Sequence, residues 1–155
     1  TGVQTCALPI CGAPWHWPGR GQEGVVGSVS AGDLGPLALA ALAAAGKQPG
    51  DAVGPAITLH FARPVDAAEL AEVRCRVYAG NLAKDGVLVV HEGGADDGDR
   101  AAGCVAFVPK DPLPAGTVEV QWELPPSLVP PVESKDGKKP KEIVRTLPSV
   151  LFTVR

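Results

Sequence analysis

The sequence predicts an all-β fold, an antiparallel β-sandwich of about six or seven short strands, preceded by an irregular segment with one short helix. Three observations indicate this class. Apolar and polar residues alternate with period two from Ile57 onward. Turn-forming residues separate the alternating runs at fairly regular spacing. Helix-like sequence is almost confined to one Ala/Leu-rich stretch that comes before them. A closed barrel is the main structural alternative.

The chain divides into three parts. Residues 1–10, TGVQTCALPI, resemble the read-through translation of a short-read sequencing adapter, and we set them aside as an adapter-derived artefact. Residues 11–54 are rich in Gly and Pro and predict an irregular lead-in or linker. It contains a short helix at 34–45, with Asp33 as N-cap and Gly46 as the stop. Residues 55–155 form the predicted sandwich domain. Because the chain contains no methionine, we expect it to be the tail of a longer polypeptide.

Seven segments predict the strands of the domain. The alternating run from Ile57 to Phe61 comes first, and RPVDAAELAEV, a turn with one helical turn, leads to VRCRVY. Asp85-Gly86 predicts a hairpin turn before VLVVHE, because glycine tolerates positive φ. GCVAFV, GTVEVQWEL, EIVRTL and SVLFTV follow. In the clearest strand, GTVEVQWEL, the residues expected to face the core are Val118, Val120, Trp122 and Leu124.

Charge and hydropathy exclude two classes of partner. The formal net charge of −3 predicts no nucleic-acid partner. The longest apolar stretch, 37–45, is far shorter than the roughly 20 residues of a transmembrane helix, so we expect no membrane span. We expect a monomer.

Cys75 and Cys104 are the reliable cysteines, because Cys6 is adapter-derived and Cys11 is partly so. Each lies in a strand-like run. A disulfide between them is expected in a secreted domain, and two free buried thiols in a cytosolic one. Both alternatives stay open. The sequence contains no CxxC and no Cys/His spacing typical of a zinc site.

Several motifs, taken in order, resemble the bacterial Ig-like domains of S-layer and other secreted proteins. The matching positions are Phe61, Pro64, Val65 and Asp66 in F-x-x-P-V-D, then Pro109, Pro112, Leu113, Gly116 and Thr117 in P-x-x-P-L-x-x-G-T, and Phe152 and Thr153 in a final F-T strand. The resemblance covers residues 55–154. It implies an Ig-like sandwich in a bacterial protein that is secreted, periplasmic or at the cell surface.

The lead-in carries a second resemblance. WHWPGRGQEGV, followed by a Pro/Gly-rich stretch, is similar to the tail of secreted bacterial proteins of the CAP superfamily, in which such a β-domain follows the CAP domain. This resemblance implies that the partner of the module is an upstream domain of the same polypeptide. The Ala/Leu segment at 37–45 fits no part of that pattern.

The leading hypothesis is a non-catalytic Ig-like accessory module, which acts as a spacer, a stabilising domain or an interaction domain. We expect no cofactor and no catalytic residue, because no G-x-S-x-G elbow is present and the serines lie in loops. Asp96, Asp97 and Asp99 lack the spacing of a calcium loop, so we expect a solvated acidic turn.

Two binding functions are the alternatives. The segment from Gly116 to Val154 resembles copper-binding β-sandwich domains of the CopC type, but Lys138 stands where that pattern has a histidine ligand. In a periplasmic copper-binding domain, the candidate ligands would be His60 and His91. A carbohydrate-binding module would instead expose aromatic rings on one sheet face. The aromatic residues available for that role are Trp15, Trp17 and Tyr78.

Overall fold

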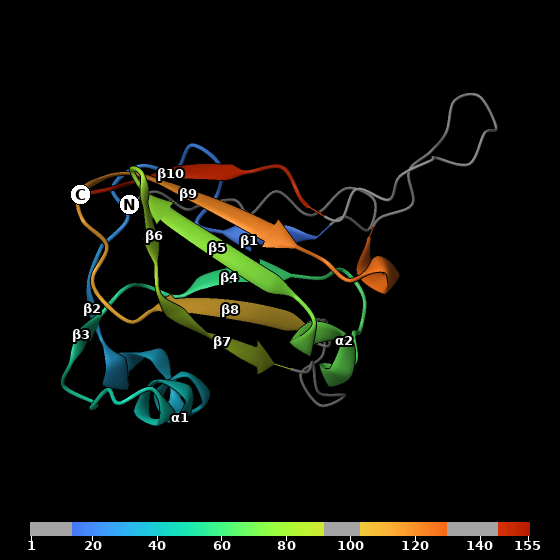
Figure 1. Cartoon of the computed structure of the whole chain (residues 1–155), viewed down its shortest axis with the longest axis horizontal. Helices are drawn as coiled ribbons and strands as arrows, with labels where there is room; N and C mark the ends of the chain where they lie inside the picture. Colours follow the sequence, from blue (N-terminus) through green and yellow to red (C-terminus); the bar gives the residue numbers. More distant parts are fainter. Residues whose placement is uncertain (1–13, 92–102, 130–145) are drawn as a thin grey trace, which may run out of the picture.

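The computed structural model describes residues 14–91, 103–129 and 146–155. Within them, two four-stranded antiparallel sheets form a sandwich (Figure 1). Sheet A has the strand order β1-β4-β8-β7, and sheet B has the order β10-β9-β5-β6. A two-stranded sheet, β2-β3, and helix α1 lie together at one corner. The predicted antiparallel sandwich with a short helix is confirmed.

The elements have the following bounds. Sheet A contains β1 (Trp15–Trp17), β4 (Ile57–His60), β8 (Cys104–Pro109) and β7 (Gly86–His91). Sheet B contains β10 (Val150–Val154), β9 (Gly116–Glu123), β5 (Arg74–Ala79) and β6 (Leu82–Lys84). The small sheet pairs β2 (Val29–Ser30) with β3 (Ala52–Val53), and the helical segments are η2 (Ala31–Leu34), α1 (Pro36–Ala44), α2 (Ala67–Ala71) and η4 (Pro126–Leu128).

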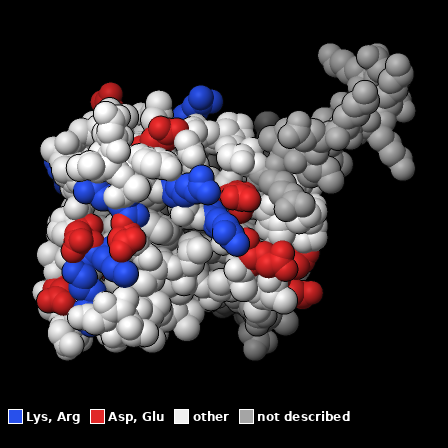
Figure 2. Space-filling view, in the orientation of Figure 1, with Lys and Arg blue, Asp and Glu red and all other residues white. Residues whose placement is uncertain are grey.

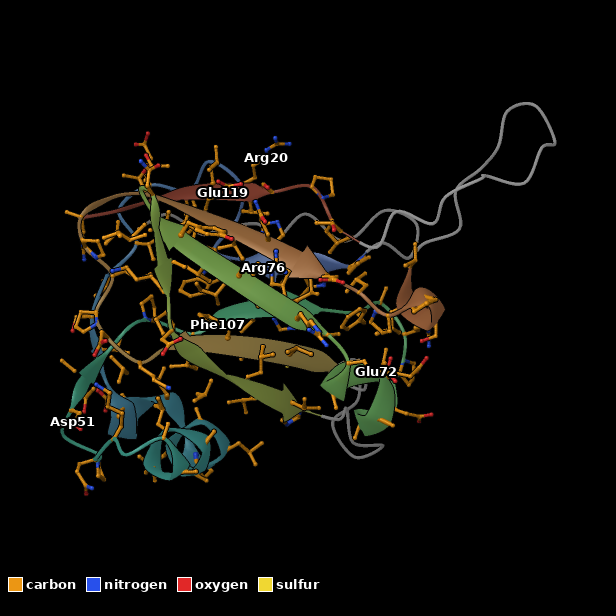
Figure 3. The ribbon with its side chains drawn as sticks, in the orientation of Figure 1. Arg20, Asp51, Glu72, Arg76, Phe107 and Glu119 are labelled. Carbon is orange, nitrogen blue, oxygen red and sulfur yellow. The ribbon has the colours of Figure 1, made fainter. Side chains whose placement is uncertain are left out.

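The main core lies between the two sheets and follows the period-two pattern. From sheet B the side chains of Val118, Val120, Trp122 and Leu124 are all buried, as predicted. From sheet A the core receives alternate residues of β4 and β8, and Phe107 is labelled in this layer in Figure 3. Each strand of this kind buries one face because successive side chains point to opposite sides of the sheet.

Helix α1 differs from its predicted bounds at its start. It begins at Pro36 with Gly35 as N-cap, whereas Asp33 lies inside η2. Proline favours the first helical turn, since it has no N–H to leave unpaired there. The predicted stop at Gly46 is confirmed: its N–H donates to the Ala43 carbonyl oxygen, and the Lys47 N–H donates to that of Leu42. These two bonds satisfy carbonyls that the last turn would otherwise leave free.

The lead-in is more ordered than its composition predicts. It supplies β1 to sheet A, and the following residues bond to β10: Gly21 N–H donates to the Leu151 carbonyl oxygen, and Val25 N–H to that of Thr153. Val25 is buried in the main core. Such short segments order only because strands that are distant in sequence offer them hydrogen-bond partners, so local periodicity does not reveal them.

The hairpin predicted at Asp85-Gly86 is wrong. Strands β6 and β7 belong to different sheets, and the chain crosses from sheet B to sheet A at this dipeptide. Strand β7 pairs instead with β8. The hairpin lies one strand earlier, where Gly80-Asn81 joins β5 to β6, and Gly80 has φ +59°. Glycine adopts that conformation without the steric cost other residues have.

The single helical turn α2 is present, as are the other predicted strands except EIVRTL. The last segment, SVLFTV, forms β10. The segment EIVRTL lies for the most part outside the described residues, and of it Thr146 forms an isolated antiparallel bridge with Glu123.

The core packing predicts the cost of truncating Trp122. Its side chain is 1% exposed and its Nε1 has no hydrogen-bond partner in the described structure. Trp122→Ala should lower the free energy of unfolding by about 3–5 kcal/mol, because it removes a buried ring and leaves a cavity. Trp122→Phe should cost less than half as much, since the lost N–H makes no bond. Urea unfolding of both variants checks this, and equal losses would contradict the assigned environment.

Candidate functional site

Two tryptophans lie together on the outer face of sheet A. Trp15 pairs with His60 and Trp17 with Thr58 in the β1–β4 register. The intervening residues of β4 point into the core, so these four side chains point to the other side. The two tryptophans are 37% and 38% exposed. As residues two apart on one strand, they are spaced about 7 Å along it.

The ring of His60 supports this aromatic pair. Its centroid lies 3.9 Å from that of Trp15, with 7° between the two planes. A hydrogen bond of 2.9 Å joins His60 Nε2 to Thr58 Oγ1 and orients the ring. In the described structure β1 is an edge strand of sheet A, and Trp15 stays partly exposed although one side of its ring stacks on His60. We call Trp15, Trp17, Thr58 and His60 the tryptophan face.

The two candidate copper ligands lie in the same row of sheet A. His60 pairs with Cys104, and Cys104 pairs with His91, so the three residues are successive across β4, β8 and β7. Their present arrangement does not form a metal site. His60 is engaged by Trp15 and Thr58, and within the described residues no three His, Cys, Asp or Glu side chains are grouped to hold an ion.

The two cysteines carry free thiols and lie in different sheets. Cys75 belongs to β5 and packs against the core between the sheets. Cys104 has the opposite orientation, since it alternates with the core residues Val105 and Phe107 and so lies on the outer face of sheet A. The disulfide that the sequence allowed is therefore not formed in this structure. Burial raises the pKa of both thiols, which keeps them protonated.

The outer face of sheet B is polar and carries mixed charge. Arg76 on β5 and Glu119 on β9 are labelled in Figure 3, and Figure 2 shows basic and acidic side chains interleaved. A hydrogen bond from Gln121 lowers the pKa of Glu119. Tyr78, the third candidate aromatic residue, lies in this sheet and so does not join the two tryptophans.

One small hollow opens on sheet B. It is lined by Arg74, Arg76, Gln121, Trp122, Glu123 and Thr146 and has a volume of about 50 Å³. Ligand pockets are usually about 300 Å³ or more, so this hollow is too small for an organic ligand. The tryptophan face is the stronger candidate site.

Some candidates lie outside the described residues: Lys138 of the copper pattern, and Asp96, Asp97 and Asp99 of the acidic turn. Of the helices in the described ranges, none has the length and hydropathy to cross a membrane.

Comparisons with protein-family models, with curated proteins and with solved structures found no match for this chain. The fold and the tryptophan face therefore define the protein only as an antiparallel β-sandwich with an exposed aromatic surface.

Sequence reasoning named both tryptophans and named His60 only as a candidate copper ligand; it did not single out Thr58. The pairing of β1 with β4 brings His60 and Thr58 beside them, and that register has no local signal. The nearest available signal was Trp-His-Trp itself, in which alternate residues of an extended segment share a face.

The stacking of Trp15 on His60 predicts a pKa for His60 that differs measurably from that of an exposed histidine. Desolvation lowers the pKa of His60 from its ordinary value of 6.5. The folded protein thus favours the neutral His60 ring. The stability that depends on this neutral ring is fully present above the pKa of the unfolded state, and it decreases as the pH falls below that value. NMR titration should give a His60 midpoint below 6.5. In Trp15→Ala the midpoint should rise toward the ordinary value, whereas an unchanged midpoint would mean that Trp15 does not shield the ring.

Proposed function

We propose that this chain is a non-catalytic Ig-like accessory module of an exported bacterial protein, and that it acts as a carbohydrate-binding module through the tryptophan face. The observation that carries the proposal is the placement of Trp15 and Trp17 on one face of an edge strand, each more than one third exposed. Large apolar side chains that remain exposed side by side commonly mark a binding surface.

The chemistry of this surface fits a sugar ring. An indole presents a flat, electron-rich face, which attracts the weakly positive C–H groups on the flat side of a pyranose. Two tryptophan positions spaced about 7 Å along the strand offer two such surfaces. The hydroxyl of Thr58 and the neutral ring of His60 lie beside them and supply polar groups for sugar hydroxyls.

The accessory role rests on the resemblance to bacterial Ig-like domains and on what its motif residues do in this fold. Phe61, Val65 and Leu113 are all buried in the main core. These motif residues therefore stabilise the core of the sandwich. The exposed residues of the tryptophan face lie outside the motifs and are available to bind a ligand. In this role the module holds its neighbouring domain close to a polysaccharide.

The proposal predicts binding to a polysaccharide that depends on both tryptophans. Native affinity electrophoresis of the full chain in gels containing hydroxyethyl cellulose, glycol chitin, xylan or mannan should show retardation by at least one of them. Trp15→Ala and Trp17→Ala should each weaken that binding tenfold or more, because each removes one stacking surface.

Leu151→Ala provides the matched control. Leu151 is 45% exposed on β10, in the other sheet, so this variant removes a similar exposed apolar group away from the tryptophan face. Its mobility in the gels should equal that of the wild type. Thermal unfolding of the variants separates lost binding from lost folding. If no polysaccharide retards the wild-type protein, the carbohydrate proposal fails.

A further inference from the structure

Helix α1 is apolar on its exposed side as well as its buried side. Its sequence, PLALAALAA, contains no polar side chain. Ala38 and Leu42 are buried against Val108 of sheet A, while Leu37 is 54% exposed. Charged side chains at this corner lie beside α1 and not on it: Lys47 follows the helix and pairs with Asp111, and Asp51 lies nearby (Figure 3). A helix that is hydrophobic all round is typical of a helix covered on all sides.

Strand β7, which α1 and α2 contact, has no strand partner beyond it among the described residues and so forms an edge of sheet A. Val87 and Val89 of β7 pack with the cluster under α1, and Leu88 is 40% exposed. The backbone directions follow from the ladder with β8. Asp85 accepts a hydrogen bond from the Lys110 N–H, so in the continuing register residues 87, 89 and 91 point to β8. The N–H and C=O groups of Leu88 and Val90 therefore point outward, and no described residue bonds to them there.

The other three sheet edges are protected in ways that β7 lacks. The lead-in bonds to β10 from Gly21 to Val25. Strand β1 has three residues and is followed by Pro18, and β6 has three residues and ends at Lys84. Strand β7, by contrast, is six residues long and contains neither Lys nor Pro. Short length, lysine and proline are the usual means by which an edge strand avoids pairing with another chain.

We propose that β7 pairs antiparallel with β7 of a second copy, so that the chain is a two-fold symmetric dimer with its two A sheets joined into one. A two-fold axis at Leu88 places this residue opposite its counterpart, with the outward backbone groups of both facing each other. It also places Val87 opposite Val89, so apolar residues meet on both faces of the seam. The same patch then serves both partners, and each copy brings its own apolar α1 beside the seam.

A second copy accounts for the unpaired backbone groups of β7 and for the exposed side chain of Leu88 together. The open edge and the exposed Leu88 recur on each protomer, so one symmetric contact covers both of them. The tryptophan face lies on β1, the opposite edge of sheet A from β7. The dimer thus leaves both tryptophan faces exposed and presents two of them to one polymeric ligand, which raises avidity.

Size-exclusion chromatography with light scattering on the full chain tests the dimer. At protein concentrations from about 5 to 200 µM, the wild type should approach twice 15.8 kDa as the concentration rises. Leu88→Lys should remain monomeric across this range, because it places a charge on the seam. Leu88→Pro should do the same, since it removes an outward N–H while leaving the ladder to β8 intact. Leu151→Lys, which puts the same charge at an exposed leucine of sheet B, should dimerise like the wild type.

Leu88→Cys adds a test of the register. Paired residues in an antiparallel ladder lie about 5.5 Å apart, within the range that a disulfide spans. Mild oxidation should therefore give a covalent dimer, whereas Leu151→Cys should stay monomeric on denaturing gels. Circular dichroism confirms that each variant is folded. A wild type that stays monomeric at all concentrations overturns the proposal, as does a dimer that persists in folded Leu88→Lys and Leu88→Pro.

Discussion

The packing of the two inner sheet faces is the constraint on which the rest of the structure depends. Strand β9 and the residue that follows it contribute four alternating side chains to it, and Trp122 is the largest of them. Burial of each side chain of this kind is worth about 1.5–3 kcal/mol. A shift of one residue in the register of β9 would turn all four toward solvent, so this strand sets which face of sheet B is outer. Sheet A packs against the same core, and its outer face, with the tryptophan face at one edge and β7 at the other, is set in the same way.

The strands that alternate clearly could be predicted from the sequence, because their periodicity reports a buried face directly. Strands β4, β5, β8, β9 and β10 belong to this group. The sequence did not predict β1, β2 and β3, since each has only two or three residues and is ordered by pairing with distant segments. The prediction of a hairpin at Asp85-Gly86 was wrong for a related reason. A turn dipeptide indicates that the chain changes direction, but it does not indicate whether the strands on either side pair with each other.

The candidate site was predictable only in part. Trp15 and Trp17 could be named because this chain has few aromatic residues. Their neighbour His60 lies more than forty positions away, and only the β1–β4 register brings it under the Trp15 ring. The cysteines show the same limit. Both lie in strands, as the sequence indicated, but the facing direction of Cys75 and Cys104 depends on which sheet each strand joins and which side of that sheet is buried.

The bonds between the lead-in and β10 have a consequence for how the protein folds. Val25 and Val154 are bridge partners, although nearly the whole sandwich lies between them in the chain. Contacts of such long sequence separation are slow to form, because a large loop must close before they stabilise anything. During synthesis, residues 21–25 therefore have no strand partner until β10 has been made. The apolar side chain of Val25 stays uncovered until β10 is in place, so this part of the core closes late in folding.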